Sequence, residues 1–326
     1  MVHLSGIPHS GLSFAGNLRT FSHKMAIISK TKTQVPQLGQ DYLLRPQLVQ
    51  QGKTAVSTHK LTLISAPAGA GKTTLAVGIA QTFEAGETAW LRLDAADNDP
   101  QTFATALVLA LQTAVPQLSE QALQHIQNVP APAQMLQQAL TLLGNELHDA
   151  VEDSLLLVFD DYHAIENTAV HNAIDYWLAQ LPPNVHLFIT TRYDPPLALA
   201  RLRMRGQLAE FRLQQLRFTP DETKSYLQKR QAIQLTAEQL ANLQSRTEGW
   251  IAGLRLLALT LGKIADATEQ DAFITQFSRS NRLVFDLLAE EVLGQQPPEL
   301  RDFLLQTSIL DELTPELCTA VTQNKS

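Results

Sequence analysis

The sequence is poor in cysteine, in charged residues and in long apolar runs. Of its 326 residues only Cys318 is a cysteine, which excludes an internal disulfide framework or a cysteine-based zinc cluster and fits a reducing compartment. No apolar run reaches the ~18 residues that a membrane span needs. The sequence therefore predicts a cytoplasmic protein that has no membrane partner.

Charged residues make up only 17% of the chain, and 25 Lys+Arg against 32 Asp+Glu give a net charge of −7. Phosphate contacts dominate sequence-independent DNA affinity, so we expect no direct DNA binding by an acidic chain without a basic stripe or a recognition-helix pair. The 44% of hydrophobic residues is enough for a sizeable core and argues against disorder. The length favours about two domains.

The first 24 residues contain Gly, Ser, His and Arg19, and no acidic residue precedes Asp41. Two interpretations fit this composition: a transit-like presequence, or an unstructured extension with Met25 as the true start. We favour the second and predict a disordered extension over residues 1–24. The segment lacks the apolar stretch of a secretory signal peptide.

The middle of the chain alternates between short apolar runs and helical stretches. The candidate strands are 61–65, 88–93, 155–159, 185–190 and 209–213, and the helical stretches between them are 73–83, 100–113, 133–147 and 169–179. Strands separated by helices indicate parallel βαβ units. We predict a three-layer α/β domain with a parallel five-stranded sheet over residues 25–218.

Only helical patterns follow that alternation. Residues 219–222 read Thr-Pro-Asp-Glu, a helix start with a hydroxyl cap, proline at the first helical position and acids near the positive end of the dipole. Another helix should begin after Thr236, and helical periods continue at 249–261, 272–293 and 298–306. The sequence therefore predicts an all-helical part over 219–326.

The strongest chemical signal lies between the first strand and the helix after it. It reads Ala66, Pro67, Ala68, Gly69, Ala70, Gly71, Lys72 and Thr73. This is the phosphate-binding pattern G-x-x-x-x-G-K-[ST] with alanine in place of the first glycine. Its glycines let backbone N–H groups wrap around an anion without interference from a Cβ, and the helix N-terminus adds its positive dipole end.

Each polar residue of this loop has an expected task. Lys72 should reach the β- and γ-phosphates, the Thr73 hydroxyl should ligate magnesium, and Thr74 should lie near the α-phosphate. The sequence thus predicts that ATP or ADP binds here together with Mg²⁺.

A second signal follows the third candidate strand, where a continuous apolar run ends in Asp160 and Asp161. This is the pattern of a Walker B strand. We expect Asp160 to hold magnesium at the carboxyl end of the strand, and Asp161 to orient or deprotonate the attacking water. The alternative for Asp161 is a helix or turn cap.

Three further residues need an interpretation. Arg192 ends the fourth strand, and it could reach the γ-phosphate as a sensor if that strand is inserted between the other two motif strands; otherwise it pairs with a surface acid. His163 has no Cys or second His at ligand spacing, so we reject zinc. Trp250 is interpreted as a packing anchor, beside Gly249 and Gly253 that allow close approach to another element.

Five segments together resemble one family in order and spacing. They are APAGAGKTTL, WLRLDAADNDPQTF, LLLVFDDYHAIEN, ITTRYDPPLALARLRMRGQLAEF and residues 247–254. They resemble the ATPase module of MalT-like, LuxR-type transcriptional activators, which belong to the signal-transduction ATPases with numerous domains and are relatives of the NACHT and NB-ARC switches. The resemblance covers residues 29–323, and LDAADNDP and DDYH are its most specific pieces.

The resemblance implies roles for individual residues. Lys72 and Thr73 match the family's phosphate and magnesium residues. Asp160 and Asp161 match its Walker B pair, and Arg192 matches its sensor arginine.

The resemblance also implies how the chain is organised. Arg45 matches a segment that lies beside the adenine, and residues 247–254 take the place of a motif that closes over the nucleotide, although they lack its proline. A helical lid domain is implied over 219–280 and an incomplete winged helix over 281–326. We therefore expect a module without the family's sensor repeats and C-terminal helix-turn-helix.

Three functions fit these observations. The first is a regulatory switch that hydrolyses ATP slowly, with a second copy of the chain or another regulatory protein as its partner. The second is an interaction module that holds ADP or ATP with little hydrolysis, or a truncated regulator without function. The third is a small-molecule kinase, against which the helical C-terminal half and the Asp160–Asp161 pair argue.

Overall fold

The structure is a computed structural model that describes residues 28–39, 42–43, 45–84, 86–118, 132–231, 235–264, 266–277, 297–310 and 313–322. The expected N-terminal extension over 1–24 lies outside the described residues, as do residues 278–296 of the expected helical part.

Five parallel strands form one sheet in the order β2-β3-β4-β1-β5. The strands are β1 (Leu61–Ser65), β2 (Thr88–Arg92), β3 (Leu155–Asp160), β4 (Val185–Thr191) and β5 (Leu208–Arg212). The predicted parallel sheet is confirmed. Strand β4 lies between β1 and β3. This is the inserted strand on which the sensor interpretation of Arg192 depended. The carboxyl ends of these three strands meet at one edge of the sheet.

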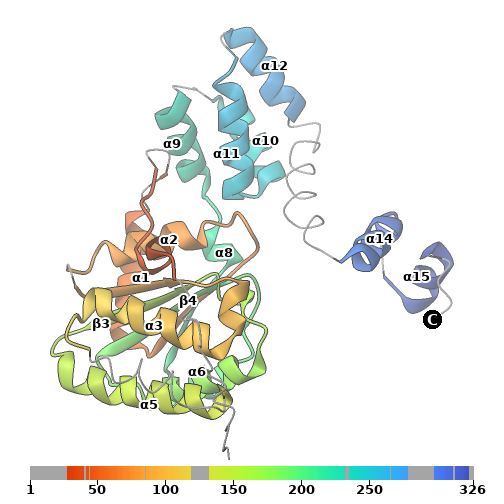
Figure 1. Cartoon of the computed structure of the whole chain (residues 1–326). Coiled ribbons are helices and arrows are strands. Elements are labelled where there is room, and N and C mark those ends of the chain that lie inside the picture. Colours follow the sequence, from red (N-terminus) through yellow and green to blue (C-terminus); the bar gives the residue numbers. More distant parts are fainter. Residues whose placement is uncertain are drawn as a thin grey trace, which may run out of the picture.

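Helices cover both faces of this sheet and make three layers (Figure 1). One face carries α1 (Pro46–Thr58), α2 (Lys72–Ala80) and α8 (Leu213–Leu216); the other carries α3 (Pro100–Ala114), α5 (Pro132–Ala150), α6 (Thr168–Gln180) and α7 (Leu199–Met204).

Alternation along β3 shows how one strand serves both layers. Leu157 and Phe159 belong to the core cluster on the α3 face, whereas Leu156 and Val158 belong to the cluster on the α2 face. A strand buried on both faces reads as an unbroken apolar run, which is why this strand was recognisable in the sequence.

The helices that follow build a separate core. α9 (Pro220–Gln231), α10 (Ala237–Thr247), α11 (Ile251–Leu261) and α12 (Ala267–Phe277) enclose a third cluster that includes Phe218, Leu243 and Leu257. We call residues 28–217 the α/β part and residues 218–277 the helical part. The expected helix start is present, because Thr219 and Glu222 cap each other's backbone N–H groups at 2.9 and 3.2 Å.

Two more helices lie near the C-terminus, α14 (Pro298–Thr307) and α15 (Pro315–Thr322), and they contact each other. None of the helices in the described ranges combines the length and the apolar composition that crossing a bilayer requires.

Candidate functional site

The loop between β1 and α2 has the backbone that its glycines predicted. Gly69 and Gly71 have φ values of +71° and +84°, in the left-handed region that favours glycine. Ala66, which replaces the first glycine of the pattern, is buried and has no positive φ, so its Cβ is tolerated. Lys72 is only 7% exposed, and its Nζ donates to the Pro67 carbonyl at 3.0 Å. The loop is therefore folded around its own lysine.

Asp160 is the centre of a buried hydroxyl–carboxylate cluster. Its Oδ1 accepts hydrogen bonds from Thr73 Oγ1 at 2.9 Å and from Thr190 Oγ1 at 2.6 Å. The residue is 1% exposed, and this burial raises the pKa of its carboxyl group above the usual value. Oxygen donors of this kind suit Mg²⁺, which commonly takes one or two protein ligands and completes its shell with phosphates and water.

Asp161 has a different environment, although it is the next residue. Its φ and ψ are 59° and 39°, a left-handed conformation that costs a non-glycine residue about 1–3 kcal/mol and that Asp accepts better than most. Its backbone N–H donates to Thr190 Oγ1 at 3.0 Å, and its carboxylate pairs with Arg92 Nε at 3.3 Å. The turn thus buries the first carboxylate and leaves the second 30% exposed at the strand end.

Further groups lie around the same strand ends. Burial lowers the pKa of Lys72. The negative charge of Asp161 opposes this effect, and the positive charge of Arg192 adds to it. Burial also lowers the pKa of His163 to about 4, with Arg192 as the next cause. The sheet therefore brings Lys72, Asp161 and Arg192 into one electrostatic neighbourhood.

His163 is uncharged at neutral pH. Its Nδ1 is buried without a hydrogen-bond partner in the described part of the chain. No group of three His, Cys, Asp or Glu side chains among the residues placed in the structure could hold a metal ion.

The start of α11 covers the loop between β1 and α2, residues 66–71, which we call the phosphate loop. Trp250 Nε1 donates to the Ala68 carbonyl at 3.2 Å, and the Ala252 N–H donates to the Gly69 carbonyl at 3.1 Å. A Cβ on Gly69 would lie 2.5 Å from the Ala252 Cβ. Trp250 also packs over Gly253, where a Cβ would lie 2.9 Å from the indole ring. The expected packing anchor is thus also a hydrogen-bond donor to the loop.

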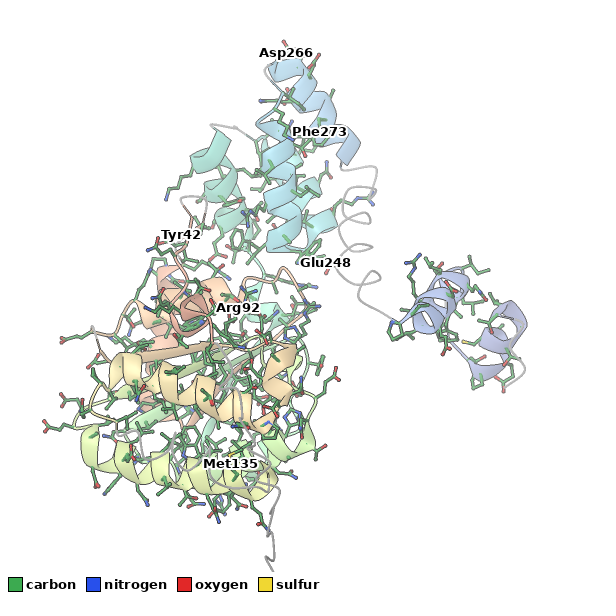
Figure 2. All side chains as sticks on the ribbon, viewed as in Figure 1. Tyr42, Arg92, Met135, Glu248, Asp266 and Phe273 are labelled. Atoms are coloured by element: carbon green, nitrogen blue, oxygen red, sulfur yellow. The ribbon has the colours of Figure 1, made fainter. Side chains whose placement is uncertain are left out.

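A cavity of about 180 Å³ lies next to the loop, between the α/β part and the helical part. Figure 2 places one of its lining residues, Tyr42, at the junction of the two parts. Three regions of the chain line the cavity. The loop before α2 and α2 itself contribute Gly71, Thr74, Leu75 and Gly78. The segment before and within α1 contributes Leu38, Gly39, Tyr42, Leu43, Arg45 and Val49, and the helical part contributes Phe218, Tyr226, Ile251 and Arg255. Apolar and aromatic walls with few polar groups are typical of ligand sites, and the volume of this cavity is below the ~300 Å³ of most such sites.

Arg45 lines this cavity, but its guanidinium points its donors elsewhere. Nε and Nη2 donate to the Glu222 carboxylate at 2.8 and 3.1 Å, and Nη1 donates to the Leu216 carbonyl at 2.7 Å. The placement beside an adenine that the resemblance implies is compatible with the cavity lining, while the hydrogen bonds connect Arg45 to the residues between the two parts.

Sequence reasoning missed three contacts at the site, although it had interpreted Glu222 as part of a helix start and Trp250 as a packing anchor. Thr190 holds both Walker B residues, Glu222 binds Arg45, and Trp250 binds the phosphate loop. A signal existed for Thr190, because a hydroxyl residue at the end of a strand beside the Walker B strand must face the same edge. No local pattern marks the other two, whose partners are distant in the chain.

The sequence of this chain is similar to sequences of MalT regulators. Residues 289–326 match the MalT winged helix domain. The chain is 34% identical over 288 residues to the HTH-type transcriptional regulator MalT of Yersinia enterocolitica, covering 87% of this chain and 31% of that protein. MalT of Serratia proteamaculans is 34% identical over 289 residues, covering 87% of this chain and 30% of the relative. The chain thus spans about a third of the length of the curated relatives it matches.

Solved structures show the same fold at low identity. A signal transduction ATPase with numerous domains and a tetratricopeptide repeat sensor, from Pyrococcus horikoshii, has a TM-score of 0.52 at 18% identity and covers 92% of this chain and 39% of its own. A Walker-type ATPase of Pyrococcus abyssi has a TM-score of 0.53 at 13% identity and covers 88% and 86%. The resemblance inferred from the motifs is confirmed: the chain is MalT-like, with a P-loop ATPase fold followed by helices and a match to the MalT winged helix domain.

Proposed function

We propose that this chain binds ATP or ADP with Mg²⁺ between its α/β part and its helical part, and that it serves as the nucleotide-dependent switch of a MalT-like regulator. The observation that carries the proposal is the position of the cavity. It adjoins the phosphate loop, and both parts line it. A ligand bound there contacts both parts, so it can favour one of their arrangements over another.

The residues divide the work as their environments allow. Lys72 supplies a positive charge to the phosphates, while the backbone N–H groups around Gly69 and Gly71 bind phosphate oxygens. Thr73 and Asp160 would hold Mg²⁺, which, when bound, offsets phosphate charge. Asp161 would orient the attacking water and accept its proton, and Arg192 would stabilise charge on the terminal phosphate.

Hydrolysis in such a switch need only be slow, because its task is to reset the arrangement of the two parts. The partner in the active arrangement would be a second copy of the chain or another regulatory protein in the cytoplasm. DNA reading is not assigned to these residues. Their part in transcriptional regulation is proposed from the names of the MalT relatives.

One observation favours a second candidate, a module that holds nucleotide without turning it over. Arg92 Nε pairs with the Asp161 carboxylate at 3.3 Å, and this is the group that would take the proton from water. In this candidate Asp161 is a turn residue with a charged partner, and the bound nucleotide only stabilises the closed arrangement of the two parts.

Isothermal titration of the purified chain with Mg-ATP, Mg-ADP and Mg-GTP tests the proposal, followed by single-turnover measurements with labelled ATP. We expect both adenine nucleotides to bind, and ATP to bind more weakly when EDTA removes magnesium. If no binding heat is measured with any of the three nucleotides at millimolar concentration, the proposal is refuted. Binding without any product after many hours would select the second candidate.

A further inference from the structure

One short segment belongs to both parts of the molecule. Val35 and Leu38 pack against the core cluster of the α/β part, while Leu43 packs against the core of the helical part. The chain then returns to the α/β part through α1, where Val49 packs against the α2 face. All but Val35 of these residues line the cavity. The described residues of this segment, 35–39, 42–43 and 45–49, therefore include a wall of the cavity and contacts to both parts.

Arg45 lies on this segment, directly before α1, and nearly all its donors are used. Besides its bonds to Glu222 and Leu216, Nη2 donates to the carbonyls of Gln215 and Arg217 at 3.2 and 3.1 Å. An arginine has five N–H donors in a fixed planar fork. At most one, on Nη1, is left for a ligand, so the main task of this side chain is to bind residues 215–222.

The last of those residues, 218–222, are attached to the helical part, whereas Leu216 packs in the core of the α/β part. Phe218 N–H donates to the Gly249 carbonyl at 2.8 Å, and Gln244 Nε2 donates to the Phe218 carbonyl at 2.8 Å. A Cβ on Gly249 would lie 2.2 Å from that same carbonyl oxygen, so the approach is close. Glu222, as part of the capping box of α9, is fixed to the first turn of the helical part.

Arg45 thus holds the junction of the two parts, because its carbonyl partners are the last residues of the α/β part and Glu222 lies at the beginning of the helical part. Its guanidinium also lies 5.3 Å from the centre of the Phe218 ring, within the range of a cation–π contact. A lysine could not reproduce this arrangement, because a single ammonium lacks the planar fork that binds a carboxylate and three carbonyls at once.

We propose that Arg45 is a positioning residue that clasps residues 215–222 and couples the filling of the cavity to the orientation of the helical part. The coupling rests on the proposed nucleotide binding, whereas the clasp itself does not. A base in the cavity contacts Leu43 and Tyr42 on the same segment, so it stabilises the clasped arrangement, and the clasp in turn stabilises the bound base. The two effects must be equal, since coupling between sites is reciprocal.

The first test needs no nucleotide. In a Cys318→Ser background, spin labels at Ser57→Cys in α1 and Lys263→Cys after α11, both exposed positions, report the distance between the parts by pulsed electron resonance. Arg45→Lys is compared with Arg201→Lys, whose parent side chain pairs with Asp175 at 3.0 Å within the α/β part. We expect a broadened or shifted distance distribution for Arg45→Lys alone. A distribution equal to that of the parent would overturn the clasp.

The second test measures the coupling with a fluorescent ADP analogue and with inorganic pyrophosphate. We expect Arg45→Lys to weaken ADP binding roughly 5- to 150-fold, chiefly through faster dissociation, and to leave pyrophosphate binding unchanged because the phosphate loop is not touched. Glu222→Gln, which keeps a capping oxygen, should give a smaller effect in the same direction.

The outcomes separate this inference from the proposed function. If the parent chain binds no nucleotide, the proposed function and the coupling are wrong, while the distance measurement still decides the clasp. If Arg45→Lys changes the distances but leaves ADP affinity within twofold of the parent, the coupling is overturned. If it weakens ADP binding without changing the distances, Arg45 contacts the base directly and the clasp is wrong.

Discussion

The indole N–H of Trp250 donates to the Ala68 carbonyl at 3.2 Å, a bond between residues 182 positions apart in the chain. It fastens the first residues of α11 to the phosphate loop, together with the bond from Ala252 N–H to the Gly69 carbonyl. The other two tryptophans, Trp90 and Trp177, are 1% exposed inside the α/β part. If the helical part separates from the phosphate loop, the resulting change in tryptophan emission should therefore come from Trp250.

Gly69→Ala should separate the helical part from the loop. The new Cβ would lie 2.5 Å from the Ala252 Cβ and 3.2 Å from Trp250 Nε1, in a backbone with φ of +71°. We expect tryptophan emission to shift to longer wavelength and the midpoint of thermal unfolding to fall.

Gly206→Ala is the matched control for this variant. Gly206 has a φ of +64° but no atom within 4 Å of the added Cβ. It should show only the backbone cost of about 1–2 kcal/mol and unchanged emission. Identical emission in the two variants would contradict the contact between α11 and the loop.

The proximity of Lys72, Asp160 and Arg192 was predictable from their places relative to the strands. Asp160 ends β3, Arg192 follows β4, and Lys72 begins α2 after the loop that follows β1. Parallel strands bring their carboxyl ends to one edge of the sheet. The residue types could be read from the sequence, and the geometry of parallel strands predicts that they lie close together.

Contacts at the junction of the two parts were not predictable in this way. The partners of Arg45 and Trp250 are mostly backbone carbonyls, which every residue possesses, so no side-chain pattern marks them. Helix α1 was missed for a related reason. It contains Gly52, which weakens helical propensity but is needed because a Cβ there would lie 2.2 Å from Ile79 Cδ1. Packing against α2 therefore stabilises α1 as a helix, although Gly52 disfavours a helix locally.

Lys72→Met should weaken nucleotide binding by at least about 10-fold while the chain stays folded. Methionine keeps most of the buried length of the side chain, so the main loss is the charge and the bond to the Pro67 carbonyl. A lost charge-assisted phosphate contact costs about 1.5–3 kcal/mol, roughly 10- to 150-fold in affinity, and more where several oxygens are bound. Titration calorimetry with Mg-ATP measures the effect, and circular dichroism checks the fold.

Lys53→Met is the control for the loss of a lysine as such. Lys53 Nζ also donates to a backbone carbonyl, that of Thr82, at 3.2 Å, but it lies outside the cavity lining and the loop. This variant should bind Mg-ATP like the parent. If Lys72→Met did so too, the phosphate-loop assignment would be wrong.

His163 should make the chain less stable in mild acid. Its pKa is about 4 in the folded chain, lowered by burial and by Arg192, against ~6.5 when exposed. Between these values the unfolded chain binds more protons, so the free energy of unfolding falls as the pH drops from about 6.5 towards 4. With allowance for partial exposure, the loss between pH 7 and pH 5 should be about 1 kcal/mol.

His163→Gln isolates this contribution, because glutamine stays neutral over the whole range. Thermal unfolding at pH 7 and pH 5 should show a smaller decrease for the variant than for the parent. His148→Gln, at an exposed position of α5, should decrease as much as the parent does. Equal decreases in all three proteins would mean that His163 does not titrate abnormally.

Asp161→Asn should bind Mg-ATP about as well as the parent and hydrolyse it much more slowly. Asparagine tolerates the left-handed conformation of this position, with φ of 59°, so the turn is kept and only the charge and basicity are lost. A general base contributes typically ~10²–10⁴-fold to the rate and little to ground-state affinity. Single-turnover assays with labelled ATP, with bound nucleotide measured after quenching, separate the two quantities.

Asp160→Asn should behave in the opposite way, because this carboxylate is 1% exposed and accepts the Thr73 hydroxyl that would share Mg²⁺ with it. Its loss should weaken binding of Mg-ATP and make the affinity for ATP nearly independent of magnesium.

Arg92→Gln supplies the remaining control. The exposed ion pair of Arg92 with Asp161 is worth only about 0–1 kcal/mol, so its removal should change the hydrolysis rate by no more than about fivefold. If Asp161→Asn hydrolyses ATP at the parental rate while Asp160→Asn is inert, the second carboxylate is only a turn residue. If none of the three variants alters turnover, the chain holds nucleotide without hydrolysing it.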